Sequence, residues 1–410
     1  MRIVIVGNGP AALSAIEGIR ETDSVSSITV LTSEPDRAYT PCFLARYVAG
    51  TIDADDLALK GNDFCQKHRV ELLAGRGVAS VVPEENVVVL DDGSKIGYDR
   101  LLLACGAEPI MPHTPDFSGE GVFVFKSLSD AARIRAHAEG VRDAVVLGSG
   151  FVAMEIAEAL TEIGVSVSMV ARTDHILRRI FDPEVADLVE DHMTLNGVRF
   201  MKCCDLAAVE RDEQGKLHTA VLSDGAQVRC EMLVVAVGMR ACTGLVAGTQ
   251  IAVSRGILTD DSMRTSVENI YAAGDVAEAE IGGVRKANLI HPHAVLAGRI
   301  AGRNMAGAIQ RMDSHLADMN VLTVFGRSFL AVGALQGEQV LRRALGSDSL
   351  VKVFADGDGR IAGVELVGDV TRGGLYASLI ARGMSVDDVP DLLSPSLNYG
   401  QTASGTSHVS

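Results

Sequence analysis

Two glycine-rich turns have the residue types and the spacing that bind a dinucleotide pyrophosphate. Each turn has the pattern G-x-G-x-x-A, follows a short apolar run (IVIV or AVVL), and opens a segment with apolar residues at helical spacing. The glycines permit a tight turn and the close approach of a pyrophosphate, whose charge is then met by amide groups at the helix N-terminus. The residues expected at the two cofactors are Gly7, Gly9, Pro10, Ala11 and Ala12 in the first turn, and Gly148, Gly150, Val152 and Ala153 in the second.

A cysteine in the segment AYTPCFLARYVAG, Cys42, is a candidate redox residue. A thiolate at this position could form a mixed disulfide with a sulfur substrate or be oxidised reversibly to a sulfenic acid. A helix N-terminus after Pro41 would lower the pKa of the thiol. The other interpretation is a small buried apolar residue, since free cysteine is among the most buried residue types. Both interpretations stay open at this point.

The cysteines as a set give no sign of a metal site or of a disulfide scaffold. Seven is an odd number, and the sequence has no C-x-x-C pair and no Cys/His spacing typical of zinc. We therefore expect no metal ion, and we expect several of these side chains to be buried.

The end of the second strand in each predicted βαβ unit should distinguish the two dinucleotides, because an acidic residue there accepts hydrogen bonds from ribose hydroxyls. In the first unit Glu34 is the nearest acid. In the second unit Ala171 stands in the acidic position and arginines follow at Arg172, Arg178 and Arg179. An absent acid with added arginines favours a 2′-phosphate, and hence NADPH, although NADH remains possible.

The elements that must position these residues predict an α/β protein. The 410 residues are too many for one core, and 42 glycines with 47% hydrophobic residues suit strands and helices joined by tight turns. Two strand-turn-helix-strand segments imply two Rossmann-like domains, and the short strands after Ala317 imply a small C-terminal α+β domain. The predicted division is a first dinucleotide domain of 1–110 and 245–315, a second of 111–244, a C-terminal domain of 316–400, and a flexible tail of 401–410.

The net charge and the absence of long apolar runs limit the partners and the location that we expect. The formal net charge is -16 and no block of lysine and arginine occurs, so we expect neither nucleic acid nor an anionic membrane as a partner. Met1 is followed within one residue by the strand-like IVIV, and no apolar run approaches the length of a membrane span. We therefore expect a cytoplasmic protein.

Three further stretches, together with the two turns, give the chain a resemblance to the FAD-dependent pyridine nucleotide-disulfide oxidoreductases. YDRLLLACGAEP resembles a family motif that usually ends in A-T-G, with Cys105 in place of the threonine before Gly106. NIYAAGDVAE resembles the second FAD motif, with Gly274 and Asp275, and HPHAVLAGRIAGRNMAG resembles the helix beside the isoalloxazine. The resemblance implies an enzyme with FAD in the first domain, a nicotinamide nucleotide in the second, and a homodimer formed through the last domain.

The same resemblance suggests roles for individual residues. Phe151 matches the aromatic residue that gates the nicotinamide pocket, and Glu155 matches a carboxylate near the nicotinamide carboxamide. Asp275 matches the residue that hydrogen-bonds the ribityl chain. His291 and His293 are candidate proton donors. Gly238, which ends the segment LVVAVG, is expected to be a cofactor-binding residue.

The resemblance leaves more than one electron acceptor open. No cysteine follows Cys42 until Cys65, so the branch with an internal cysteine pair is excluded. In the single-cysteine branch, which includes coenzyme A-disulfide reductases, NADH oxidases and persulfide reductases, the pattern C-x-L-P-Y-x-x-x-G is echoed by CFLARYVAG, although Ala45 and Arg46 depart from it. Our leading hypothesis is transfer from NADPH through flavin to Cys42 and then to a small disulfide or persulfide.

Two rival hypotheses remain. A third branch, the rubredoxin and ferredoxin reductases and the flavin part of nitrite reductases, needs no cysteine and reduces an electron-carrier protein. Its features are echoed by SEPDRAYTP, by His291-Pro292-His293-Ala294 and by GRIAGVELVGDV. A non-catalytic sensor that binds both cofactors is the other alternative.

Overall fold

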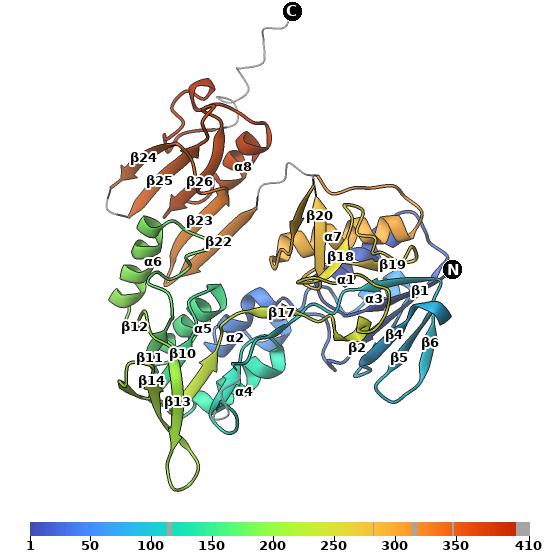
Figure 1. Ribbon diagram of the computed structural model, residues 1–410, viewed down its shortest axis with the longest axis horizontal. Helices are drawn as coiled ribbons and strands as arrows, with labels where there is room; N and C mark the ends of the chain where they lie inside the picture. The colour runs from blue at the N-terminus through green and yellow to red at the C-terminus, as the bar shows by residue number, and fades with distance from the viewer. Residues whose placement is uncertain (113–116, 282, 314–317, 347, 399–410) are drawn as a thin grey trace, which may run out of the picture. The chain divides into compact units, whose positions relative to one another are not determined.

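The chain divides into two compact units. The computed structural model describes residues 1–112, 117–281, 283–313, 318–346 and 348–398 (Figure 1). The first unit comprises Met1–Ile110, Lys126–Ala132 and Gly238–Ser314, and the second unit comprises the described parts of 111–125, 133–237 and 315–410. The three-domain division predicted from the sequence, with boundaries at 110/111, 244/245 and 315/316, stays a prediction. The predicted tail of 401–410 lies outside the described residues.

The first unit is built on a five-stranded parallel sheet with the order β19-β7-β1-β2-β3. Its strands are β1 (Arg2–Val6), β2 (Ser27–Thr32), β3 (Val70–Ala74), β7 (Arg100–Leu103) and β19 (Ile270–Ala272). Helices α1 (Pro10–Arg20) and α7 (His291–Met305) pack together against this sheet, and their apolar residues form one core with it. Glycines let the two helices touch: a Cβ at Gly298 or Gly302 would lie 2.1 Å from the carbonyl oxygen of Ala11 or Ala15.

Smaller elements complete the first unit. A second core on the other face of the sheet includes residues of an antiparallel meander. Further strands are β4 (Val78–Val82), β5 (Val87–Leu90), β6 (Lys95–Gly97), β18 (Ile257–Thr259), β20 (Ala277–Ile281) and β21 (Val284–Lys286). The short helical segments are η1 (Pro41–Phe43), α2 (Leu44–Val48), η2 (Ala54–Leu57), α3 (Phe64–His68), η3 (Pro83–Glu85) and η4 (Gly244–Val246).

The second unit contains another five-stranded parallel sheet, with the order β12-β11-β10-β16-β9. Its strands are β9 (Val122–Val124), β10 (Asp143–Leu147), β11 (Ser166–Val170), β12 (Arg199–Met201) and β16 (Met232–Val235). Helices α5 (Phe151–Glu162) and α6 (Pro183–Leu195) belong to this unit, whereas α4 (Leu128–Ala138) begins in the first unit and continues into the second at Arg133. An antiparallel sheet of β13 (Leu206–Arg211), β14 (Leu217–Leu222) and β15 (Gln227–Arg229) shares a core with it.

The two stretches of chain near the unit boundaries pair with each other within the first unit. β8 (Ala107–Pro109) and β17 (Met239–Ala241) form an antiparallel pair, and Arg240 and Glu108 form an ion pair across it at 2.7 Å. Cys105 Sγ donates a hydrogen bond to the carbonyl oxygen of Cys242 at 3.4 Å. This ribbon continues directly from the predicted FAD motif that ends at Gly106.

The C-terminal part of the second unit is an antiparallel sheet with the order β22-β23-β26-β25-β24. Its elements are β22 (Met319–Val324), β23 (Arg327–Gly333), β24 (Gln339–Leu345), β25 (Ser349–Ala355), β26 (Ile361–Val367), α8 (Gly373–Ala381) and η5 (Val386–Asp388). Helix α8 packs on one face of this sheet and forms an apolar core with it (Figure 1). The α+β character predicted for this part of the chain is therefore present, with one strand, β24, that the sequence did not reveal.

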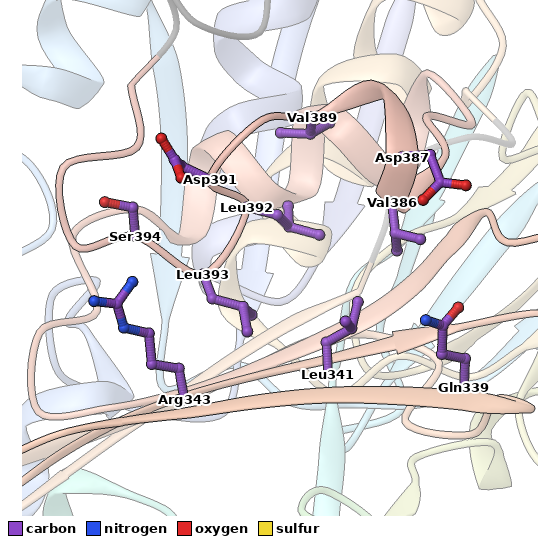
Figure 2. A pocket seen from close by; sticks show the side chains of 10 residues that line it. All are labelled: Gln339, Leu341, Arg343, Val386, Asp387, Val389, Asp391, Leu392, Leu393 and Ser394. Atoms are coloured by element: carbon purple, nitrogen blue, oxygen red, sulfur yellow. The ribbon is translucent and has the colours of Figure 1, made fainter.

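A pocket of about 360 Å³ lies between β24 and the segment of residues 386–394 (Figure 2). Leu341, Leu392 and Leu393 line its apolar part, and Arg343 and Asp391 extend charged groups beside it. None of its lining residues is a predicted site residue. Among the described residues, no helix combines the length and the apolar character that crossing a membrane requires.

Candidate active site

The first glycine turn leaves open space where a cofactor would lie. Gly7 has φ +113°, and a Cβ there would lie 2.1 Å from the carbonyl oxygen of Ala104, so the chain itself requires glycine at this position. A Cβ at Gly9 would meet no protein atom within 4 Å. Gly9 caps α1 and Pro10 is in the first turn, so the helix N-terminus opens at this point. These residues fit the pyrophosphate of FAD, whose charge the first amides of α1 would meet.

A second loop of the first unit adds charged groups beside α1. Gly274 has φ +79°, and a Cβ there would lie 3.1 Å from the Cβ of Ala11. Asp275 follows directly and forms an ion pair with Lys126 at 3.5 Å. Lys126 is 149 residues away in the sequence, and no sequence pattern pointed to it.

The predicted residues Cys105 and Gly106 lie after β7. This strand is the neighbour of β1, which the first glycine turn follows. Burial raises the pKa of the Cys105 thiol to about 12, so the thiol is neutral and acts as a hydrogen-bond donor. Gly106 has φ +74°. Cys105 is therefore unsuited to the role of a reactive thiolate, which agrees with its prediction as a cofactor-binding residue and not as a nucleophile.

Glu34 lies two residues beyond the end of β2, as the ribose interpretation requires. The hydroxyl of Tyr39 donates a hydrogen bond to its Oε2 at 2.7 Å, and the backbone N–H of Leu128 donates to the same hydroxyl at 3.1 Å. Burial, and then the Glu34 carboxylate, raise the pKa of Tyr39 well above its usual range, so Tyr39 stays a donor. Tyr39 thus orients the predicted ribose-binding carboxylate, and no local sequence pattern pointed to this role.

Cys42 lies in the first unit, in η1. The residue is exposed, so the interpretation of a buried structural thiol is wrong. The helix expected after Pro41 exists only as η1 followed by the five-residue α2, so its dipole at Cys42 is small. Leu44 is buried and anchors the segment.

His291 is the first residue of α7 and also belongs to the first unit. Its Nε2 is buried and has no hydrogen-bond partner in the described part of the chain. Burial lowers the pKa of His291, and the nearby Asp275 opposes this shift. A buried imidazole nitrogen without a partner is a group that a ligand could satisfy. His293 lies two residues further along α7.

The second glycine turn repeats the geometry of the first within the second unit. Gly148 has φ +140°, and a Cβ there would lie 2.2 Å from the carbonyl oxygen of Ala236. Gly150 caps α5, and a Cβ there would meet nothing within 4 Å. Val152 and the buried Ala153 follow in the first turn of α5. Open space beside a helix N-terminus fits a second pyrophosphate.

The arginines predicted to bind a 2′-phosphate are on the surface after β11. Ala171 is buried at the end of that strand. Arg172 lies 3.6 Å from Asp205, and Arg178 lies 3.9 Å from Asp174, with both arginine side chains mostly exposed. Exposed ion pairs of this kind are weak, so both guanidinium groups can turn toward a phosphate at low cost. The remaining predicted residue, Gly238, has φ +135° and falls in the first unit.

Phe151 is the first residue of α5, directly after this turn, and Glu155 lies four residues further along the helix. Phe151 packs edge to face on Phe181, with 6.4 Å between the ring centroids. Burial, and then the charge of Glu158, raise the pKa of Glu155 to about 7. Glu155 therefore changes charge close to neutral pH, which is typical of a functional carboxyl group.

We expect the affinity for NAD(P)H to rise as the pH increases through about 7, because only ionised Glu155 is a full acceptor for a carboxamide N–H. A charge-assisted hydrogen bond of about 1.5 kcal/mol corresponds to a roughly tenfold change in Kd. Glu155→Gln should bind with little pH dependence in this range, while Glu162→Gln, at the exposed end of the same helix, should behave like the wild type. Parallel pH profiles for Glu155→Gln and wild type would remove Glu155 from the nucleotide site.

Comparison with known proteins identifies the family. The family described as pyridine nucleotide-disulphide oxidoreductase matches residues 1–295. The chain belongs to the pyridine nucleotide-disulphide oxidoreductases. This oxidoreductase is therefore an NAD(P)H-dependent flavoprotein enzyme that uses FAD, and the predicted family, enzyme class and cofactors are confirmed. The roles of individual site residues stay predictions.

Relatives of this oxidoreductase differ in what their names say they act on. It is 31% identical to the NADH-dependent phenylglyoxylate dehydrogenase subunit epsilon of Aromatoleum evansii, over 93% of this chain and 91% of the relative. It is 32% identical to a rubredoxin-NAD(+) reductase of Alcanivorax borkumensis, over 68% of this chain and 72% of the relative. A solved NAD-dependent persulfide reductase from A. fulgidus has a TM-score of 0.89 at 25% identity, with 98% of this chain and 80% of that chain covered.

Proposed function

We propose that this oxidoreductase transfers electrons from NADPH through FAD to Cys42, whose thiolate reduces a low-molecular-weight disulfide, persulfide or related sulfur compound. The observation that carries the proposal is the exposed Cys42 in the same unit as the first glycine turn, Asp275 and His291. The similarity to a persulfide reductase over nearly the whole chain supports the sulfur substrate.

Different residues of the chain bind the two cofactors. The Gly7–Gly9 turn, Glu34 and Asp275 hold FAD, and the Gly148–Gly150 turn with Arg172 holds NADPH. When bound, FAD supplies the hydride and electron-pair chemistry that connects a nicotinamide with a thiol. Phe151 covers the nicotinamide site and excludes water, and Glu155 accepts a hydrogen bond from the carboxamide.

The sulfur chemistry takes place at Cys42 Sγ. The thiolate attacks one sulfur of the substrate, a bond from Sγ to that sulfur forms, the substrate S–S bond breaks, and a thiolate or sulfide departs. Two electrons from NADPH then break the new S–S bond and restore the Cys42 thiolate. His291 supplies a proton to the departing sulfur. The sum for a disulfide is NADPH, one proton and one disulfide giving NADP⁺ and two thiols.

An acceptor panel tests the proposal. Purified holoenzyme is assayed for NADPH oxidation with coenzyme A disulfide, glutathione persulfide and rubredoxin, under anaerobic conditions. We expect turnover with at least one sulfur compound and little turnover with rubredoxin. We also expect kcat/KM for NADPH above that for NADH, because Ala171 stands in the place of an acid and is followed by Arg172 and Arg178. Turnover with rubredoxin alone would contradict the sulfur substrate, and a clear NADH preference would contradict the role of the arginines.

A second candidate function is the reduction of an electron-carrier protein or of a partner subunit. It is favoured by the 31% identity with an enzyme subunit over 93% of this chain and by the 32% identity with a rubredoxin reductase. In that case Cys42 has no redox role, and Cys42→Ser keeps full activity. The homodimer and the cytoplasmic location stay predictions, of which the first is checked by light scattering.

A further inference from the structure

Three charged side chains form a row across the C-terminal sheet of the second unit. In the strand register Arg342 of β24 pairs with Lys352 of β25, and Lys352 pairs with Glu365 of β26. Because side chains alternate along a strand, all three lie on the face opposite to the apolar core with α8. Lys352 is only 7% exposed and Glu365 is fully buried. A buried lysine and a buried glutamate need partners to be stable.

The partners come from the N-terminus of α6. Lys352 Nζ contacts Asp182 Oδ2 and lies 3.0 Å from Glu184 Oε2, while Arg342 lies 2.7 Å from Glu184 Oε1. Glu365 Oε1 accepts a hydrogen bond from the backbone N–H of Asp182 at 2.7 Å. Asp182 is also the N-cap of α6, where its side chain accepts from the N–H of Val185. The sheet therefore holds the residue at which α6 begins.

Asp182 also ends the segment 171–182, which folds over the second glycine turn. Within this segment the N–H of Leu177 donates to the carbonyl oxygen of Ser149, between Gly148 and Gly150, at 2.8 Å. Phe181 packs edge to face on Phe151 on one side and on Phe329 of β23 on the other, each with 6.4 Å between centroids. The segment is thus tied to the glycine turn in its middle and to the C-terminal sheet at its end.

We propose that Lys352 and Glu365 are positioning residues of the nicotinamide-nucleotide site. By holding Asp182 they fix the segment that carries Arg172 and Arg178 against the second glycine turn. This inference rests on the proposed function, because it assigns the nucleotide to that turn. The C-terminal sheet then supports nucleotide binding through the segment 171–182 and does not itself contact the nucleotide.

Loss of the Lys352 charge should weaken binding and leave the chemistry unchanged. Without the ammonium group, Asp182, Glu184 and Glu365 remain together with no central cation, and Asp182 moves toward water. The segment 171–182 then has to be ordered when the nucleotide binds, and that cost reduces affinity. Since Lys352 does not touch the reacting atoms, KM should rise while kcat changes little.

The experiment compares Lys352→Met with Lys202→Met in the FAD-containing enzyme. Lys202 is a matched control because it forms an ion pair with Glu190 of α6 at 2.9 Å, and this ion pair includes no residue of the C-terminal sheet. We expect Lys352→Met to raise the Kd for NADP⁺, measured by equilibrium titration of the flavin absorbance, by about tenfold or more. FAD content should be unchanged, Lys202→Met should stay within about twofold, and Lys352→Arg should recover most of the affinity. Wild-type affinity in well-folded Lys352→Met would overturn the inference.

A second variant covers the case in which Lys352→Met does not fold. Burial raises the pKa of Glu365 to about 8, and the Asp182 carboxylate adds to the shift, whereas the hydrogen bond from the Asp182 backbone N–H and the charge of Lys352 oppose it. The charged groups that face it are Asp182 and Glu184 from α6, Lys352 from β25 and Arg342 from β24. Ionisation above pH 8 places a second carboxylate beside Asp182, so the wild-type Kd should rise between pH 7.5 and 9, while Glu365→Gln should bind tightly with a flat profile. Equal profiles would overturn the inference.

The outcomes separate the inference from the proposed function. A wild-type enzyme that binds neither NADP⁺ nor NAD⁺ contradicts the assignment of the second glycine turn, and with it the proposed function. A wild type that binds nucleotide, with an unchanged Kd in Lys352→Met and a wild-type pH profile in Glu365→Gln, contradicts the positioning role alone.

Discussion

Replacing Cys42 by serine is expected to lower NADPH-dependent turnover of a disulfide or persulfide by on the order of 10³-fold or more. A serine hydroxyl is not ionised near neutral pH, so it cannot attack a sulfur and leave as a thiolate does. The substitution exchanges one sulfur atom for an oxygen atom at an exposed position. The variant should therefore keep its FAD content, its thermal stability and its reduction by NADPH.

An anaerobic titration with NADPH measures the redox role of Cys42 directly. If Cys42 stores electrons, for example as a sulfenic acid, the wild type takes up two more electrons per FAD than Cys42→Ser. If the thiolate lies against the flavin, only the wild type shows the corresponding long-wavelength absorbance band. Cys203→Ser is the matched control, since Cys203 is an exposed cysteine of the second unit. Identical titrations of wild type and Cys42→Ser, with normal sulfur turnover in the variant, would refute the proposal.

Replacing Gly9 by valine is expected to abolish FAD binding, with an increase in Kd of at least about 100-fold. Gly9 has φ −90° and ψ −171°, an extended conformation that valine adopts readily, and a Cβ there meets no protein atom within 4 Å. Neither the backbone conformation nor the space around this Cβ therefore requires glycine at this position. A requirement for glycine would come from the cofactor alone, because the new methyl groups occupy the space beside the α1 N-terminus.

The measurement pairs FAD content with the thermal stability of the apoprotein. Gly9→Val apoprotein should melt within about 2 °C of wild-type apoprotein, since surface substitutions change stability by at most about 0.5 kcal/mol. Gly7→Ala should show a different signature, with a lower apoprotein melting temperature, because its Cβ would lie 2.1 Å from the Ala104 oxygen. Gly150→Val should keep FAD and lose nicotinamide-nucleotide binding. Normal FAD content in Gly9→Val would show that the first turn does not hold the cofactor.

Features that depend on neighbouring residues were predictable from the sequence. The two glycine turns follow strands and open helices, as predicted, because the G-x-G spacing and the apolar periodicity are local signals. The helix predicted from His291 is present as α7. By contrast β24 was missed, because QVLRRAL is mostly exposed at the edge of its sheet and has no clear apolar alternation.

Site residues that depend on distant pairing were not predictable. Lys126 meets Asp275, and Tyr39 bridges Glu34 and Leu128, only because the chain returns to the first unit. The Lys352–Glu365 pair does have a signal in the sequence, namely a single charged residue in each of the apolar runs LVKVF and GVELV. This signal indicates a pair only once the strand register places the two residues opposite each other.

The contact between α1 and α7 also has a consequence for how the protein is made. Helix α1 ends at Arg20, whereas α7 begins only at His291, and the strand β19 that completes the same sheet begins only at residue 270. The glycines of α7 fit against α1 with no room for any side chain. The apolar face of α1 therefore cannot pack against α7 until nearly three hundred further residues have been synthesised. During that time, at about 5–20 residues per second, the first half of the nascent chain depends on chaperones or on transient packing to avoid aggregation.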